Sequence, residues 1–258
     1  MQPLLNIAIN AARQAGDVIL RHIELLDRIK ITAKGHQNYC SEVDIKAEQA
    51  IIHTLRKAYP DHGIVSEESP AYRSDAECVW IIDPLDGTNN YLHGFPFYCV
   101  SIALEIKHKI EHAVIYDPLR HECFSASRGS GARLNDRRLR VSKQTQLSSA
   151  MIGTGASLQH NKNPDDVLSV HALLSQCANV RRTGSAALDL AYVASGRLDG
   201  FFESGLQTWD LAAGSLLIQE AGGLVSDYQG KDDYVKRGDI VAATPKLFKS
   251  LLQGLQPK

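Results

Sequence analysis

The sequence predicts an α+β protein in two halves, the first built on an antiparallel sheet and the second on a sheet covered by helices. Two amphipathic helical patterns open the chain, and short apolar runs separated by tight turns follow them. Beyond a junction rich in glycine, serine and arginine, strand-like and helix-like segments alternate. We place the two halves at residues 1–140 and 141–258, although a chain of 258 residues would also suit one large domain.

The first half is predicted to contain two helices and at least five strands. Apolar residues at helical spacing predict helices over 4–19 and about 44–55, the second ending before the turn at 60–63. These helices should pack against each other. Short connections at 107–109 and 117–120 should join at least three strands into an antiparallel meander. The predicted strands are 64–65, 79–82, 98–106, 113–116 and 122–126.

The second half follows a junction from about 128 to 144 in which no periodicity is visible. The glycines within 127–131 lack a strand-loop-helix context, and we interpret them as a hairpin or linker turn. The alternation that follows indicates a sheet with helices on its faces. The predicted strands are 151–153, 180–182, 198–203, 224–226 and 240–243, and the predicted helices are about 165–177, 185–195, 211–221 and 245–255.

The composition is that of an ordinary globular protein, with 44% hydrophobic residues, 22% charged residues and a net charge of -1. It excludes wholesale disorder and a global field that would attract nucleic acid or an anionic membrane. No apolar run approaches the length of a membrane span and the N-terminus lacks the order of a signal peptide, so we expect a cytoplasmic protein. The cysteines are scattered without a C-x-x-C pair, which favours buried thiols: Cys40, Cys78, Cys99, Cys123 and Cys177.

Two aspartates, Asp83 and Asp86, follow a fully apolar run at a spacing of three residues. Pro84 stiffens the exit from the strand, and the residues from Asp86 to Thr88 can begin a helical turn on which both acids face one point. Two such acids repel each other unless a proton or a cation lies between them, and hard divalent cations prefer carboxylate oxygen. Gly87 allows close backbone approach, and free amides at the start of a helical turn suit a phosphate oxygen. Taken alone, the motif is explained equally well as a capped, aspartate-rich turn.

Further acids occur at matching structural positions. Glu67 and Glu68 directly follow a predicted strand, and Asp210 begins a predicted helix rich in small residues. Each of these acids alone is better explained as a helix-start acid or a solvated face.

Taken together, these motifs resemble the ordered signature of the inositol monophosphatase family. The similarity in order and spacing extends from Leu4 to about Ala243 and is closest to the SuhB-type bacterial members. The resemblance implies a layered αβαβα architecture of the sugar-phosphatase type, with a mixed sheet in the second half. The motifs that carry it are Glu67-Glu68, Asp83-x-x-Asp86-Gly87-Thr88 and Trp209-Asp210-Leu211-Ala212-Ala213-Gly214, with the segments 181–189 and 200–203 for the SuhB-type members.

The resemblance also implies a magnesium centre. By similarity, Glu67, Asp83 and the backbone carbonyl of Leu85 hold one Mg²⁺. A second Mg²⁺ is held by Asp86 and Asp210 and shares Asp83 with the first. Some family members bind a third, weaker ion near Glu67. The chemistry implied is direct attack of a metal-activated water on a phosphomonoester, without a covalent phosphoenzyme.

The predicted catalytic residues are Glu67, Thr88 and Asp44, of which the last two resemble the family pair that orients or deprotonates the water. Asp44 follows Cys-Ser-Glu-Val where the family usually shows a V-T-x-x-D pattern, and a first-turn helix aspartate is the alternative. Lys34 is similar to a family lysine near that water, but a solvated lysine explains it nearly as well.

The resemblance further implies a set of substrate contacts. Glu203 ends an apolar strand, where an acid is unfavourable unless it is used or solvated. Arg182 contacts phosphate, pairs with an acid or lies at a subunit interface, and the sequence does not choose among these. The residues predicted to contact substrate are Asp86, Gly87, Thr88, Arg182, Gly184, Ser185, Ala186 and Glu203.

The function implied is hydrolysis of myo-inositol 1-phosphate or similar polyol phosphates by a lithium-sensitive homodimer. Relatives with the same metal core hydrolyse 3′-phosphoadenosine 5′-phosphate or fructose 1,6-bisphosphate, and these stay as alternatives. The residues from Gly87 to Tyr91 resemble the G-T-x-N-F form of inositol monophosphatases rather than the G-T-[KR]-x-F form of the nucleotide phosphatases.

An alternative of another class is a binding role, because some SuhB-type proteins act in transcription antitermination. Such a role would use a surface that contacts RNA or the transcription machinery. A solvated basic loop is the simpler explanation of the residues concerned, which are Arg133, Arg137, Arg138 and Arg140.

Overall fold

The computed structural model describes residues 3–35, 38–155 and 171–255, and it contains two β-sheets and a short ribbon. The larger sheet has seven strands in the order β3-β4-β5-β6-β7-β8-β9, and the smaller has five in the order β11-β10-β12-β14-β13. The ribbon pairs β1 with β2. The larger sheet uses the chain up to Arg138, and the smaller sheet begins at Met151.

The elements of the first half match the predicted pattern and add to it. The two predicted helices are α1 and α2, and the predicted strands are β3 to β7, which form the expected antiparallel meander from β4 onward. The prediction was an antiparallel sheet, but the larger sheet is not antiparallel throughout, because β3 pairs in parallel with β4. The elements are α1 (Pro3–His22), the 3₁₀ helix η1 (Ile23–Arg28), β1 (Ile31–Gly35), β2 (Asn38–Ser41), α2 (Glu42–Ala58), β3 (Gly63–Ser66), β4 (Cys78–Asp86), α3 (Thr88–Leu92), β5 (Cys99–Ile106), β6 (Lys109–Asp117), β7 (Glu122–Ser127), β8 (Gly131–Leu134) and β9 (Arg137–Arg138).

The second half has the predicted alternation. Strands β10, β11 and β12 pair in parallel, whereas β14 pairs antiparallel with β12 and β13, so the sheet is mixed as expected. Of the helix predicted over about 165–177, residues 171–174 are helical and the earlier part lies outside the described residues. The elements are η2 (Leu147–Ser149), β10 (Met151–Thr154), β11 (Asn179–Arg181), α5 (Ala186–Ala194), β12 (Gly200–Glu203), α6 (Thr208–Glu220), β13 (Leu224–Ser226), α7 (Tyr234–Arg237), β14 (Ile240–Ala243) and α8 (Pro245–Gly254).

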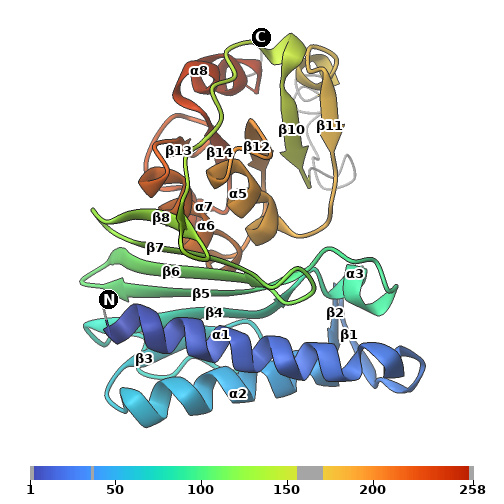
Figure 1. Ribbon diagram of the computed structural model, residues 1–258, viewed down its shortest axis with the longest axis vertical. Coiled ribbons are helices and arrows are strands. Elements are labelled where there is room, and N and C mark those ends of the chain that lie inside the picture. The colour runs from blue at the N-terminus through green and yellow to red at the C-terminus, as the bar shows by residue number, and fades with distance from the viewer. Residues whose placement is uncertain (1–2, 36–37, 156–170, 256–258) are drawn as a thin grey trace.

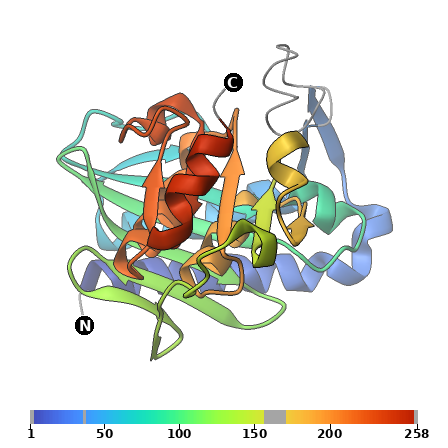
Figure 2. The same cartoon turned by 90° about the horizontal axis from the view of Figure 1, so that it is seen from above.

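Five layers of secondary structure are stacked, which confirms the αβαβα architecture (Figure 1). Helices α1 and α2 cover one face of the larger sheet, α5 and α6 lie between the sheets, and α8 covers the outer face of the smaller sheet (Figure 2). Successive residues of β12 therefore face different cores: Phe201 packs with α5 and α6, and Phe202 packs with α8.

The packing of α1 follows from its small residues. Ala8, Ala11, Ala12 and Ala15 form a fully buried stripe at helical spacing. Gly16 continues it, and a Cβ there would lie 2.6 Å from the ring of Tyr116 on the sheet. The helix can therefore lie close against both α2 and the sheet.

The predicted aperiodic junction at 128–144 was wrong in its first part. The meander continues there through β8 and β9, which form the edge of the larger sheet. These strands have four and two residues, too few for alternation to show in the sequence. The glycines within 127–131 form the hairpin turn between β7 and β8, as predicted.

Two expectations about composition are confirmed within the described residues. Within the described residues no cysteine forms a disulfide. Cys40, Cys99 and Cys123 are buried as expected, whereas Cys78 and Cys177 are half-buried. No helix in the described part of the chain is long and apolar enough to cross a membrane.

Candidate active site

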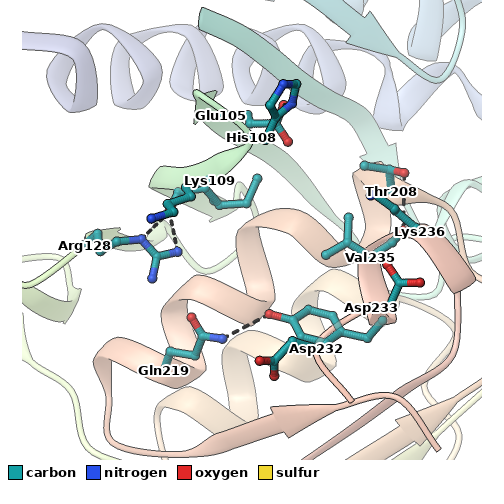
Figure 3. Close-up of a pocket in the computed structure, with 12 residues that line it drawn as sticks. Glu105, His108, Lys109, Arg128, Thr208, Gln219, Asp232, Asp233, Val235 and Lys236 are labelled. Carbon is teal, nitrogen blue, oxygen red and sulfur yellow. Dashed lines mark hydrogen bonds and ion pairs between the residues drawn. The ribbon is translucent and has the colours of Figure 1, made fainter. Parts of the chain in front are cut away.

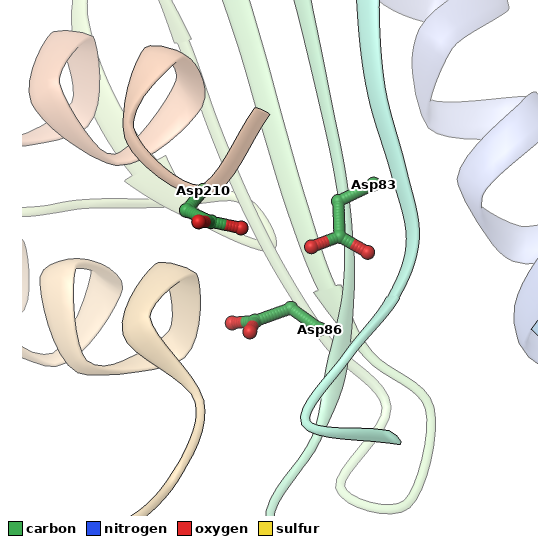
Figure 4. Close-up of side chains that lie close together, drawn as sticks. All are labelled: Asp83, Asp86 and Asp210. Atoms are coloured by element: carbon green, nitrogen blue, oxygen red, sulfur yellow. The ribbon is translucent and has the colours of Figure 1, made fainter. Parts of the chain in front are cut away.

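Three aspartates from distant parts of the chain converge in the space between the two sheets. Asp83 and Asp86 lie at the end of β4, and Asp210 lies in the first turn of α6. One carboxylate oxygen of each lies within 4.8 Å of those of the other two. Figure 4 shows the three side chains pointing toward a common space. The structure thus brings together three of the four side chains predicted to bind metal.

Burial and mutual repulsion disfavour ionisation of these carboxyl groups. Asp83 is 2% exposed, and burial together with the charges of Glu67 and Asp86 raises its pKa well above its usual value. Burial, followed by the charge of Asp86, raises the pKa of Asp210 to about 7. Burial raises the pKa of Asp86 as well, although a hydrogen bond from Ser185 lowers it.

The converging groups fit a hard divalent cation. All three are carboxylates, the ligands that Mg²⁺ and Ca²⁺ prefer, and among the described residues the converging group includes no thiol or imidazole. A cation would also balance charges that otherwise repel one another in a buried space. The cluster is therefore capable of binding a metal.

A bulge in β4 presents the first two aspartates. Asp83 pairs with Ser101 of β5, but Asp86 pairs with Cys99, so the register shifts between the two aspartates. The backbone nitrogen of Leu85 donates to Asp83 Oδ1 at 3.0 Å, which fixes the carboxylate on the bulge. The sequence predicted a strand that ends at residue 82, whereas the ladder continues to Asp86, because a bulge re-aims side chains without ending the pairing.

Gly87 and Thr88 begin a short helix directly after the bulge, as predicted. Gly87 has a φ of 94°, and a Cβ there would lie 3.0 Å from the carbonyl oxygen of Phe97, so this position favours glycine. Thr88 opens α3, and its Oγ1 lies 3.0 Å from the carbonyl oxygen of Leu85. The single hydroxyl hydrogen of Thr88 can reach either this carbonyl oxygen or Asp44 Oδ1, so the carbonyl of Leu85 keeps its lone pairs available for a metal when the hydrogen points to Asp44.

The two carboxylate oxygens of Asp44 accept hydrogen bonds from two different residues. Oδ2 accepts hydrogen bonds from the backbone nitrogen and the hydroxyl of Ser41, which completes a capping box at the start of α2. Oδ1 accepts a hydrogen bond from Thr88 Oγ1 over 2.8 Å. Burial raises the pKa of Asp44 against these hydrogen bonds, which lower it. Helix capping and contact with Thr88 therefore coexist in one side chain.

Glu67 lies near the aspartates but is not one of the three converging groups. It follows β3, and its backbone nitrogen donates to the carbonyl oxygen of Ile82 at 3.2 Å. Its charge contributes to the raised pKa values of Asp83 and Asp210. The side chain of Lys34 lies outside the described residues.

A cavity of about 200 Å³ adjoins the aspartates at the start of α5. There Asp86 Oδ2 accepts hydrogen bonds from Ser185 Oγ at 2.6 Å and from the backbone nitrogen of Ala187 at 2.7 Å. All of the predicted substrate residues except Gly87 and Thr88 line this cavity. The lining residues are Asp86, Gly155, Arg182, Gly184, Ser185, Ala186, Asp189, Glu203, Leu206 and Asp210.

Glu203 contributes a buried carboxyl group to the wall of this cavity. Burial, followed by the charges of Asp86 and Asp210, raises the pKa of Glu203 to about 8, while Arg182 lowers it. Gly155 lies directly against this side chain, since a Cβ there would come within 2.1 Å of Glu203 Oε1. Residue 155 must therefore be glycine if Glu203 is to keep its place.

Three residues that line the cavity were missed by sequence reasoning: Gly155, Asp189 and the apolar Leu206. Gly155 carries no signal, because only the approach of Glu203 distinguishes it from other glycines. Asp189 is 2% exposed, and its Oδ2 accepts a hydrogen bond from Thr183 Oγ1 at 2.6 Å. Burial raises the pKa of Asp189 to about 7. An acid near a predicted helix start was the available signal, but such acids are usually solvated.

A larger cavity, of about 690 Å³, lies away from the aspartates between the β5–β6 turn, α6 and α7 (Figure 3). Several of its polar side chains are committed to one another or to the backbone. Arg128 Nε and Nη2 both donate to the carbonyl oxygen of Ile110, and Gln219 Nε2 donates to Tyr234 Oη at 3.0 Å. Volume alone therefore does not identify the site, whereas the converging carboxylates do.

The predicted basic residues form an exposed arginine strip, defined as Arg133, Arg137, Arg138 and Arg140, along the edge of the larger sheet. Arg133 and Arg138 lie directly opposite each other across β8 and β9. Like charges in such positions are destabilising. Within the described residues, no carboxylate forms an ion pair with any of the four.

Comparison with known proteins gives one consistent result along the whole chain. The sequence model of the inositol monophosphatase family matches residues 1–257. The protein named Nus factor SuhB from Pseudomonas aeruginosa is 52% identical over 263 residues, covering 100% of this chain and 97% of the relative. The crystal structure of the extragenic suppressor protein suhB from Bartonella henselae superposes with a TM-score of 0.95 at 42% identity, covering 99% of each chain. The inositol monophosphatase from Anabaena superposes with a TM-score of 0.86 at 36% identity, covering 98% of this chain and 94% of that one.

Proposed function

Because this chain belongs to the inositol monophosphatase family, we propose that it is a Mg²⁺-dependent phosphatase of inositol 1-phosphate or similar small polyol phosphates. The observation that carries the proposal is the convergence of Asp83, Asp86 and Asp210 beside a cavity of about 200 Å³. A phosphomonoester in that cavity would have its phosphoryl group at the carboxylates and its alcohol against the opposite wall.

The residues proposed to hold two or three Mg²⁺ ions are the three aspartates together with Glu67 and the carbonyl of Leu85. When bound, Mg²⁺ supplies charge neutralisation, a lowered pKa for water and stabilisation of the leaving oxygen. Asp83 is the proposed shared ligand, which agrees with its being the most buried of the four acidic side chains proposed to bind metal and with the repulsion it receives from Glu67, Asp86 and Asp210.

Thr88 and Asp44 are proposed to orient the attacking water and take its proton. Thr88 has one hydroxyl hydrogen, and Asp44 Oδ1 lies 2.8 Å away to accept it. With its hydrogen so directed, Thr88 Oγ1 can accept a hydrogen bond from water. Burial raises the pKa of Asp44, which makes this carboxylate a stronger proton acceptor than an exposed one.

The alcohol part of the substrate is proposed to lie against Glu203, Arg182 and the turn at Gly184 and Ser185. Glu203 and Ser185 offer oxygen acceptors for hydroxyl groups, and the amides at Gly87 and Thr88 would contact phosphoryl oxygens. The cavity is smaller than the roughly 300–1,000 Å³ of typical drug-sized sites. That size favours a small polyol phosphate over an adenosine bisphosphate, with fructose 1,6-bisphosphate as the intermediate case.

A substrate panel with the purified protein tests this proposal. Phosphate release would be measured from inositol 1-phosphate, glycerol 2-phosphate, fructose 1,6-bisphosphate and 3′-phosphoadenosine 5′-phosphate, with and without Mg²⁺ and Li⁺. We expect Mg²⁺-dependent, Li⁺-inhibited release that is fastest from the polyol phosphates. Preference for a bisphosphate would reject the substrate class, and absence of Mg²⁺-dependent release from all four would reject the enzymatic proposal.

We also infer a second role for the arginine strip, in binding RNA or a protein of the transcription machinery. Relatives such as the Pseudomonas aeruginosa protein are named Nus factors. Arginines that repel each other, and that form no ion pair with a carboxylate of the described residues, are stabilised when an anionic partner neutralises them. Replacing Arg137, Arg138 and Arg140 with alanine should weaken association with RNA or with transcription proteins while phosphatase activity is retained. Unchanged association in the triple variant would contradict this role.

The family further supports a homodimer, and the cytoplasm is the proposed location. Sedimentation velocity of the purified protein tests the dimer, since a species of one subunit's mass at micromolar concentration would contradict it.

A further inference from the structure

Glu48 is a buried glutamate on α2 that none of the proposed catalytic steps uses. It is 1% exposed, and within the described residues no cationic side chain forms an ion pair with it. A buried carboxylate is unfavourable unless hydrogen bonds satisfy its oxygens. Something other than a salt bridge must therefore account for an acid at this position.

Both carboxylate oxygens of Glu48 accept hydrogen bonds from the loop that follows β3. Oε2 accepts one from the backbone nitrogen of Glu68 at 3.0 Å, and Oε1 accepts one from Ser69 Oγ. These two donors come immediately after Glu67 in the sequence. Hydrogen bonds to a charged acceptor are stronger than neutral ones, so Glu48 holds this loop firmly.

The same loop is also anchored on its other side. The backbone nitrogen of Glu67 donates to the carbonyl oxygen of Ile82, the residue that precedes Asp83 in β4. Glu67 thus lies between one anchor on β4 and another on α2. The position of its carboxylate relative to Asp83 depends on both anchors.

Helix α2 also supports the start of α3, directly after β4, because Asp44 lies one turn before Glu48 and accepts a hydrogen bond from Thr88. Val43, Ala47 and Ile51 are fully buried on this helix, so its position is fixed by the core. One helix, α2, therefore holds both the loop after β3 and the start of α3, and each of these segments carries proposed site residues.

We propose that Glu48 is a positioning residue that sets Glu67 for metal binding by anchoring the backbone of the loop after β3. The inference rests on the proposed function, in which Glu67 is a metal ligand. Glu48 itself makes no contact with substrate or metal in this account, and its contribution is the geometry of a ligand that a loop would otherwise hold loosely.

The test compares Mg²⁺ and Mn²⁺ binding, measured by titration calorimetry with the metal alone, in variants of the full-length protein. Glu48→Ala should raise the Kd of the metal by about 10- to 100-fold, the usual effect of losing an outer partner of a metal ligand. Glu48→Gln should restore most of the affinity, because its carbonyl can accept from the Glu68 nitrogen and its amide can donate to Ser69 Oγ. Gln49→Ala, at the exposed neighbouring position, is the matched control and should bind as wild type does.

Hydrogen exchange provides a readout that requires neither metal nor substrate. In metal-free protein, the amide of Glu68 should exchange faster in Glu48→Ala than in wild type, while amides of β4 keep their protection. Ser69→Ala removes one anchor without placing a cavity in the core, and it should raise the metal Kd by a smaller factor than Glu48→Ala. If Glu48→Ala fails to fold, the metal Kd of Ser69→Ala tests the positioning role of Glu48 instead.

The outcomes separate this inference from the proposal on which it rests. If the wild type binds no divalent metal, the proposed function fails. If the wild type binds metal and both Glu48→Ala and Ser69→Ala bind it with unchanged Kd, the positioning role of Glu48 is wrong. Lower thermal stability with unchanged metal Kd in the folded variants would likewise assign Glu48 a purely structural role.

Discussion

Thr88 Oγ1 donates a hydrogen bond to Asp44 Oδ1 over 2.8 Å, joining the start of α3 to the first turn of α2. Asp44→Asn keeps an acceptor for the hydroxyl but removes the group proposed to take the proton. We expect kcat to fall by about 100-fold or more, since positioned general bases contribute roughly 10²–10⁴-fold, with little change in KM. Glu42→Gln, another first-turn acid of α2, is the control. Steady-state kinetics in which both variants match wild type would remove Asp44 from the mechanism.

The cavity wall should lose its shape if Gly155 gains a side chain. In Gly155→Ala, the new Cβ would collide with Glu203 Oε1, so the carboxylate must move. We expect kcat/KM for a polyol phosphate to fall by about 100-fold, the scale of a 1 Å misplacement, while Mg²⁺ affinity is retained. In a Glu203→Ala background the same change should have no further effect, because the two residues act through one contact. Additive losses in the double variant would contradict this coupling.

The raised pKa of Asp189 should make the free energy of unfolding depend on pH. Its pKa is raised from 3.8 to about 7 in the folded protein, so the folded state holds the proton more tightly than the unfolded state does. The stabilisation of the folded state by protonated Asp189 is therefore fully present below about pH 4, and it is lost as the pH rises to about 7. The neutral side chain of Asp189→Asn does not titrate, so the variant should not lose stability over this pH range. At pH 8 its free energy of unfolding should exceed that of wild type by up to about 4 kcal/mol.

Urea unfolding of wild type and Asp189→Asn at pH 4, 6 and 8, with a chelator present, checks this expectation. The difference between the two proteins isolates Asp189 from the other buried acids. A difference that does not change with pH would show that the raised pKa of Asp189 has no influence on folding.

Mg²⁺ should stabilise the protein through the acid cluster. Metal at 100 times its Kd would raise the free energy of unfolding by about 2.7 kcal/mol. Asp83→Asn should unfold at a higher temperature than wild type in the presence of a chelator, because one of the repelling acids is neutral. With Mg²⁺ present, wild type should unfold at the higher temperature, because it binds the metal more tightly than Asp83→Asn does. Calorimetric scans that show the same order under both conditions would be inconsistent with a metal site at Asp83.

Much of the fold could be predicted because the pattern of the sequence is local. The alanine stripe of α1 and the apolar runs of β4 to β7 are periodic or continuous over enough residues to identify their elements. Strands β8 and β9 are too short to show a period. β8 is a strand because it pairs with β7, and β9 is one because it pairs with β8. Their pairing depends on tertiary contacts, which a local sequence pattern does not encode.

The candidate site could be predicted only in part for the same reason. Asp83, Asp86 and Asp210 were found through a resemblance that links distant motifs, and the structure brings them within 4.8 Å. Glu48 and Gly155 carry no signal of their own, since a helix glutamate and a loop glycine are ordinary residues. Their importance follows from tertiary contacts. Glu48 accepts a hydrogen bond from Ser69, and Gly155 lies directly against the carboxylate of Glu203.

The most direct test of the account is the rate of Mg²⁺-dependent phosphate release from inositol 1-phosphate by Asp83→Asn, with the exposed Asp61→Asn as its control. The account predicts normal folding of both variants, a wild-type rate for Asp61→Asn, and a loss of roughly 1000-fold for Asp83→Asn, equivalent to about 4 kcal/mol of transition-state stabilisation. A folded Asp83→Asn protein that releases phosphate at the wild-type rate would contradict the proposed metal-dependent site.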